Sequence, residues 1–111
     1  MGNSQDFRKM AAREKILITV DSELKAFLPK YLENRKADLD KLRVALEMDD
    51  FNALQTLSHK IKGHATSYGF TQLSPLCKQM ETAAINHEKK IISALLDEYA
   101  DYISRVDISQ T

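Results

Sequence analysis

Four segments of this chain repeat apolar residues every three or four positions, the spacing that gives an amphipathic helix one buried face. The segments cover about residues 22–48, 51–68, 71–86 and 88–106. Pro29 lies inside the first segment and should kink that helix, whereas Pro75 is tolerated in the first turn of the third. Three glycines and two prolines in 111 residues leave little room for the turns of an all-β fold. The pattern predicts an all-α, up-down antiparallel four-helix bundle.

The ends of the predicted helices carry capping residues. Asp21 or Ser22 is expected to cap the first helix, and Asp49 and Asp50 should close it and cap the second. Gly69 is placed where the second helix must stop, because glycine adopts the left-handed conformation of that position most easily. These signals predict short connections between neighbouring helices.

Several apolar residues are expected in the core. Phe27 belongs to the buried stripe of the first helix, and Met48 and Met80 are interpreted as core filler. Cys77 is on the apolar side of its helix, which favours an inert buried thiol over a reactive one. As the chain has one cysteine, it can form no internal disulfide, which suits a reducing cytoplasm.

The chain is interpreted as an extension, a bundle and a tail, at residues 1–20, 21–106 and 107–111 respectively. In the extension, Ser4 could cap a short helix through Phe7, Met10 and Ala11. Residues 16–20 are either extended or a connector between helices. The structure of the extension is the least determined by the sequence.

The second predicted helix carries a histidine on its polar face. Its apolar residues fall within roughly 80° of one another at about 100° per residue, and they are Leu54, Leu57, Ile61, Ala65 and Tyr68. His59 lies roughly opposite this stripe, with Lys62 one turn along the helix and Gly63 directly after it. The arrangement predicts a solvent-facing imidazole that another macromolecule can reach.

Each of these residue types suits phosphoryl transfer. A neutral histidine persists near pH 7, so a ring nitrogen of His59 can act as a nucleophile without a separate base. Lys62 can stabilise charge on the equatorial oxygens of a phosphoryl group. Gly63 costs about 1 kcal/mol of helix stability relative to alanine, which suggests that a partner approaches the backbone closely there.

The spacing of these residues resembles that of the histidine phosphotransfer (HPt) domain family. The resemblance rests on the string His59-x-Ile61-Lys62-Gly63, on Gly69-Phe70 six residues later, and on a set of further positions over roughly residues 20–106. These positions are Phe27, Leu28, Asp49, Asp50, Phe51, Leu73, Cys77, Met80 and Glu81. His64 departs from the pattern, because the family usually has a small residue there. We interpret it as a partly buried packing residue.

The resemblance implies a four-helix bundle and a function. His59 would accept a phosphoryl group from an aspartate of a receiver domain and pass it to another. Lys62 would stabilise charge, and Gly63 would allow close approach. The receiver domain would supply Mg²⁺, so this chain would be a stoichiometric phosphocarrier without its own cofactor. The donor, the acceptor and the direction of transfer stay open.

The sequence around His59 contains no acidic residue over thirty consecutive positions, between Asp50 and Glu81. The polar side of the second helix is mostly short and uncharged, and we expect it to bind the partner through Asn52, Gln55, Thr56, Lys60 and Thr66. Such a surface would not repel a phosphoryl group. Chance is the alternative explanation for so short an interval.

Other classes of function are disfavoured. Sixteen basic and sixteen acidic residues cancel, so no overall field favours nucleic acid, and no apolar run reaches the length of a membrane span. There is no glycine-rich loop for ATP. His59 and His64 diverge around the helix and cannot clamp one metal ion, and His87 is either a helix-terminal cation or a loop residue. We expect a monomer. The alternatives are a helical adaptor that binds a partner through the His59 face without phosphoryl chemistry, and a plain structural bundle.

Overall fold

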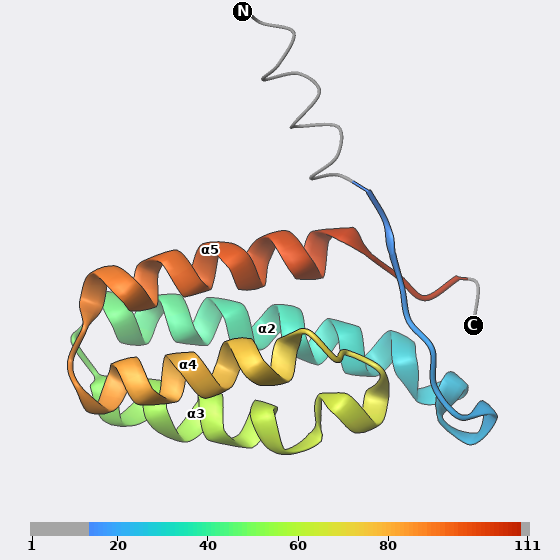
Figure 1. Cartoon of the computed structure of the whole chain (residues 1–111), viewed down its shortest axis with the longest axis horizontal. Helices are drawn as coiled ribbons and strands as arrows, with labels where there is room; N and C mark the ends of the chain where they lie inside the picture. Colours follow the sequence, from blue (N-terminus) through green and yellow to red (C-terminus); the bar gives the residue numbers. More distant parts are fainter. Residues whose placement is uncertain (1–13, 110–111) are drawn as a thin grey trace, which may run out of the picture.

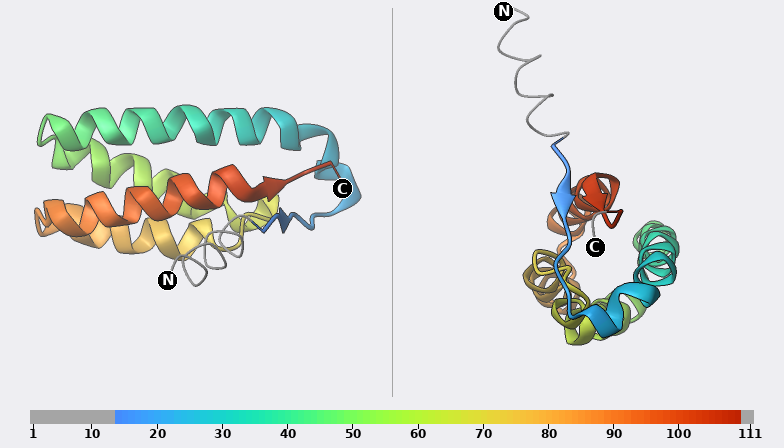
Figure 2. Two further views of the ribbon diagram at one scale, coloured as in Figure 1. Left: turned by 90° about the horizontal axis from the view of Figure 1, so that it is seen from above. Right: turned by 90° about the vertical axis from the view of Figure 1, so that its right-hand side faces the viewer.

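The computed structural model describes residues 14–109, and its main part is a bundle of four helices (Figure 1). They are α2 (Leu28–Glu47), α3 (Phe51–His64), α4 (Leu73–Ile85) and α5 (Lys89–Arg105). Viewed from the end, the four helices surround one interior (Figure 2). The predicted all-α antiparallel bundle is confirmed. No helix in the described part of the chain is both long and apolar enough to cross a membrane.

The interior of the bundle is built from the predicted apolar stripes, and every helix contributes fully buried side chains. They include Leu28, Leu42, Leu54, Ile61, Leu73, Ile92, Leu96 and Tyr99. Cys77 and Met80 are also fully buried, as predicted. The prediction for Met48 is wrong, since this residue is 73% exposed. Met48 follows the last residue of α2 and precedes Asp49, whose positive φ turns the chain away from the core.

The first predicted helix begins later than expected. Residues Ser22–Phe27 form a 3-10 helix, η1, and the α-helix begins at Leu28. Pro29 therefore occupies the first turn of α2 and does not kink it, because a proline there removes an N–H that has no partner within the helix. Asp21 precedes η1 without a side-chain capping bond, and Phe27 is largely exposed, so its predicted burial is wrong.

The two ends of α3 follow the capping signals. The Asp50 carboxylate accepts a hydrogen bond from the backbone N–H of Ala53 at 3.0 Å, as an N-cap should. At the other end α3 stops at His64, earlier than predicted, and the chain tightens into a 3-10 turn, η2 (Thr66–Tyr68). Gly69 then adopts φ 83°, in the left-handed conformation expected of it.

Two short strands join the ends of the described chain. β1 (Ile16–Leu17) pairs in parallel with β2 (Val106–Asp107), beyond the end of α5 (Figure 1). The extended alternative is thus confirmed for residues 16 and 17, and residues 18–20 belong to no helix or strand. The helix α5 ends at Arg105, one residue before the predicted limit. The predicted helix through Phe7 lies outside the described residues. Beyond β1, Ile18 enters the core with 2% exposure.

Candidate functional site

His59 lies on the exposed side of α3, with 65% of its side chain accessible. On the opposite side of the helix, Leu54 and Ile61 are fully buried, while Leu57 is only partly buried. Ser58 takes a core position that was not predicted, and its hydroxyl makes no hydrogen bond within the described part of the chain. The predicted solvent-facing orientation of His59 is confirmed.

A carboxylate from the neighbouring helix contacts both functional side chains of α3. The Nδ1 atom of His59 lies 2.9 Å from Glu81 Oε2, and the Lys62 ammonium donates to Glu81 Oε1 at 2.8 Å. Glu81 belongs to α4, which packs along α3, and it was not among the predicted site residues. The available signal was its place as the first acid after the thirty-residue interval. Only the packing of α4 on α3 shows which side chains it contacts.

The charges of Lys62 and Glu81 determine which ring nitrogen of His59 carries the proton and which carries the lone pair. The Lys62 ammonium, and then the His59 ring, lower the pKa of Glu81, so its carboxyl group is ionised at neutral pH. An ionised carboxylate can only accept hydrogen bonds, so the Nδ1 atom of His59 must carry the proton. In the neutral ring the lone pair is then on Nε2. The exposed imidazole is held in the tautomer that presents Nε2 as a nucleophile.

The backbone next to His59 is open on its outer side. A Cβ atom added to Gly63 would meet no atom within 4 Å, and this glycine is exposed. One residue earlier, the Lys62 carbonyl oxygen accepts a hydrogen bond from the Ser74 hydroxyl of α4 at 3.0 Å. Neighbouring structure therefore fixes this turn of α3 from inside and leaves its outer surface accessible.

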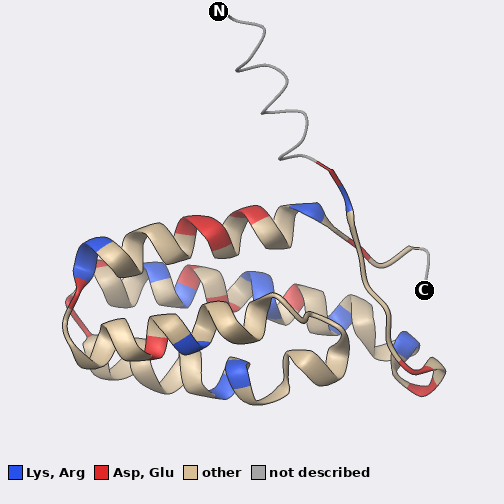
Figure 3. Cartoon of the chain, in the orientation of Figure 1, with Lys and Arg blue, Asp and Glu red and all other residues tan. Residues whose placement is uncertain are grey.

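The residues predicted to bind the partner lie on the same side of α3 as His59 or in the turn that follows this helix. Asn52, Thr56, Lys60 and Thr66 are exposed and Gln55 is half-buried; Thr66 lies in η2, beyond the end of α3. Helical spacing places the α3 members within about 100° of His59. The expectation of an acid-free surface is wrong, because α4 carries an acidic position (Figure 3) and its Glu81 contacts His59. That charge is paired with Lys62.

The other two histidines have structural surroundings. Nδ1 of the half-buried His64 lies 2.6 Å from the Tyr31 hydroxyl, and burial, followed by the charge of Arg35, lowers the pKa of His64. The packing interpretation of His64 is confirmed. His87 follows α4 with φ 55° and stacks on the Phe51 ring at a centroid distance of 4.2 Å, so it is a loop residue. No group of three or more metal-ligating side chains occurs among residues 14–109.

Comparison with known proteins gives one finding. A family model described as the Hpt domain matches residues 26–108, about three quarters of the chain, which include all four helices and His59. No match was found among curated proteins or among solved structures. From the family match and the bundle described above, we conclude that the chain belongs to the Hpt domain family, which acts in histidine phosphotransfer within two-component phosphorelays.

Proposed function

We propose that His59 carries a phosphoryl group between aspartates of receiver domains. The observation that carries this proposal is the exposed His59 ring, whose Nδ1 atom lies 2.9 Å from the Glu81 carboxylate. This contact directs the lone pair of Nε2 to solvent, where the phosphoaspartate of a docked receiver can meet it. Lys62 lies one helical turn away and provides a positive charge beside the reacting atoms.

The transfer step exchanges one bond to phosphorus for another. The Nε2 lone pair of His59 attacks the phosphorus of the aspartyl phosphate, and an N–P bond forms. The P–O bond to the aspartate breaks, and its electron pair leaves with the carboxylate. The Nδ1 proton stays on the ring, where the Glu81 carboxylate stabilises the positive charge that the imidazole acquires. The same step in reverse, with a second aspartate, discharges His59.

The remaining charge stabilisation is divided between the partners. Lys62 is held by Glu81 here with 31% of its side chain exposed, and its flexible stem lets the ammonium turn to an equatorial phosphoryl oxygen. Mg²⁺ would come with the receiver domain. Within the described residues no cluster suited to a metal ion accompanies His59. The open backbone at Gly63 gives the receiver room to approach.

The test is incubation of the full chain with a phosphorylated receiver domain, followed by intact mass and by the acid and base stability of the product. We expect one added phosphoryl group that is lost in acid and stable in base. His59→Gln should abolish the adduct while leaving the helix content unchanged, and His64→Gln is the matched control that should retain it.

Two results would contradict the carrier function. An adduct that persists in His59→Gln would place the phosphoryl group elsewhere. Measurable binding to receiver domains without any adduct, and with equal affinity in His59→Gln, would instead support an adaptor that uses the same surface.

A further inference from the structure

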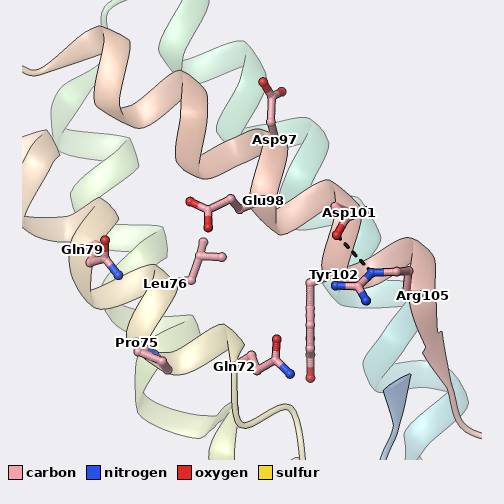
Figure 4. Close-up of a pocket in the computed structure, with 9 residues that line it drawn as sticks. All are labelled: Gln72, Pro75, Leu76, Gln79, Asp97, Glu98, Asp101, Tyr102 and Arg105. Atoms are coloured by element: carbon pink, nitrogen blue, oxygen red, sulfur yellow. Dashed lines mark hydrogen bonds and ion pairs between the residues drawn. The ribbon is translucent and has the colours of Figure 1, made fainter. Parts of the chain in front are cut away.

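A pocket of about 440 Å³ lies between α4 and α5, away from the candidate site (Figure 4). Apolar and aromatic surface comes from Pro75, Leu76 and the buried Tyr102. Helical spacing places Leu76 roughly 140° around α4 from Glu81, so the pocket and the His59 contact are on different sides of that helix. The pocket is therefore a separate surface feature of the bundle.

The α5 side of the pocket is acidic. Asp97, Glu98 and Asp101 line it together with one cation, Arg105, which is bonded to Asp101 at 3.0 Å. Asp97 contacts Arg43 of α2 at 3.4 Å. Within residues 14–109, Glu98 makes no hydrogen bond or ion pair, and it projects from α5 toward the space between the helices (Figure 4). This pocket offers apolar surface beside an unbalanced negative charge.

The beginning of the described chain is attached at one end of this pocket. The backbone carbonyl oxygen of Glu14 accepts a hydrogen bond from Arg105 Nη1 at 3.4 Å. Because Ile16 pairs in parallel with Val106, residues upstream of β1 start alongside the last turn of α5. The first described residue, Glu14, therefore lies beside the arginine of the pocket.

The sequence of residues 1–13 is complementary to the pocket. It contains three basic residues, Arg8, Lys9 and Arg13, and one acid, Asp6. In the helix expected through Phe7, Met10 and Ala11, these apolar residues share one face, and Arg8 and Arg13 flank it. Lys9 falls on the opposite face. About ten helical residues span roughly 15 Å, enough to pass the two turns of α5 that separate Arg105 from Asp97.

We propose that residues 1–13 dock as an amphipathic helix into the groove between α4 and α5. The apolar face of the segment covers Leu76 and Tyr102, and its arginines meet Glu98 and the neighbouring aspartates. The docked segment leaves the His59 face open, so this proposal is independent of the phosphoryl chemistry. Its partner is a segment of the same molecule, because the chain links that segment covalently to Glu14 beside the pocket and so keeps its local concentration high.

A nitroxide spin label on Gln5→Cys in the full chain tests the docking. Cys77 is fully buried, and burial raises the pKa of its thiol to about 12, so labelling is directed to the introduced cysteine. We expect the label to broaden the amide NMR signals of Gln79 and Glu98 and to leave those of Thr56 on α3 sharp. Broadening confined to other surfaces, or absent from α4 and α5, would overturn the proposal.

Charge reversal separates docking from chance proximity. Arg8→Glu with Arg13→Glu should abolish the broadening at Gln79 and Glu98, and Glu98→Arg added to that variant should restore part of it. Lys9→Glu is the control, since it reverses a single charge on the opposite face and should keep the broadening. Equal loss in the Lys9→Glu control would contradict the proposed orientation.

A mixed sample distinguishes the intramolecular segment from a second copy. Spin-labelled chain without ¹⁵N is combined with ¹⁵N-labelled chain that carries no spin label. We expect no broadening at Gln79 and Glu98 in this sample. Broadening as strong as in the singly prepared protein would show that the groove is filled by the segment of another molecule and would overturn the proposal.

Discussion

At the scale of single residues, the chemistry proposed for His59 depends on a carboxylate from another helix. Glu81 accepts from the His59 ring and from the Lys62 ammonium with different oxygen atoms. The first contact selects the ring tautomer, and the second fixes a cation one turn from the nucleophile. Glu81 thus links His59 and Lys62, which are neighbours on α3, although it lies 22 positions from His59 in the sequence.

Glu81→Gln should disturb this arrangement without unfolding the bundle. The amide can still accept a hydrogen bond but lacks the charge, so the share of His59 protonated at Nδ1 should fall. Because the lost interaction is partly exposed and worth about 1 kcal/mol, phosphoryl transfer should slow roughly fivefold. Ring ¹⁵N shifts and single-turnover transfer measure the two effects, with Glu47→Gln as the control. An unchanged tautomer ratio would mean that Glu81 does not orient the ring.

The two described glycines provide a second prediction at this scale. Gly63→Ala should stabilise the protein by about 0.5–1 kcal/mol, because it raises helix propensity and the new methyl group meets no atom within 4 Å. Gly69→Ala should destabilise it by about 1–2 kcal/mol or more, since φ is 83° and the methyl group would lie 2.7 Å from Ile18, Val20 and the Thr19 carbonyl oxygen. Urea unfolding measures the free energy of unfolding of the two variants and of the unaltered protein.

A larger side chain at Gly63 separates folding from docking. Gly63→Gln should retain the stability of the protein yet slow transfer from a receiver domain, because the longer side chain occupies the open backbone next to His59. Unimpaired transfer in Gly63→Gln would contradict the need for close approach.

At the scale of elements, the segment that starts at β1 acts as a strap across the bundle. Ile18 enters the core, and the Ile18 and Val20 side chains and the Thr19 carbonyl oxygen lie next to Gly69, at the connection between α3 and α4. β1 meanwhile pairs with β2 at the end of α5. This strap, residues 16–20, therefore holds the ends of three helices, although all of it precedes the family match, which begins at residue 26.

Substitutions in the strap should show this role. Ile18→Ala should lower the free energy of unfolding by about 2–4 kcal/mol, because it leaves a cavity in the core. Leu17→Ala is the control: Leu17 is 60% exposed, and its loss should cost less than about 0.5 kcal/mol. Thermal and urea unfolding measure both. Equal effects of the two substitutions would show that the strap does not contribute to the core.

At the scale of the whole molecule, aromatic contacts tie the start of α2 to the end of α3 and to the turn that follows it. The Tyr31 ring stacks on Tyr68 at 4.1 Å and meets Phe70 edge-on at 5.0 Å. Its hydroxyl lies 2.6 Å from His64 Nδ1, and a neutral His64 accepts a hydrogen bond from it there. Burial, followed by the charge of Arg35, lowers the pKa of His64 and keeps this ring neutral in the folded protein.

The stability of the bundle should fall when the pH drops below about 6.5. The folded pKa of His64 lies below its ordinary value of 6.5, so the unfolded chain binds more protons between these two values and acid favours unfolding. Glu81 adds to this loss of stability at lower pH. Its pKa is lowered from 4.5 in the folded protein, so the stability that its charge provides is lost as the pH falls through the folded pKa. Urea midpoints at pH 7.5, 6 and 5 measure the effect. His64→Gln should flatten the upper part of this dependence, and an unchanged slope would contradict the assignment.

Much of the architecture could be predicted because it depends on local order along the chain. Helical periodicity indicates which face of each segment is apolar, so the exposure of His59 and the burial of Met80 followed from spacing alone. The caps at Asp50 and Gly69 depend on the conformations of one or two residues, so the sequence predicted them as well. The delayed start of α2 at Leu28 was missed, because the 3-10 segment before it has the same apolar spacing at this length.

The sequence by itself determined four helices, their buried faces and a histidine turned to solvent, because periodicity and capping are properties of neighbouring residues. Only the tertiary structure decided which carboxylate reaches His59, and that β1 pairs with β2 across ninety positions of the chain. Both depend on the packing of segments that are distant in sequence. A one-dimensional pattern specifies what each helix must bury, but contact between two helices follows from how their buried faces fit together.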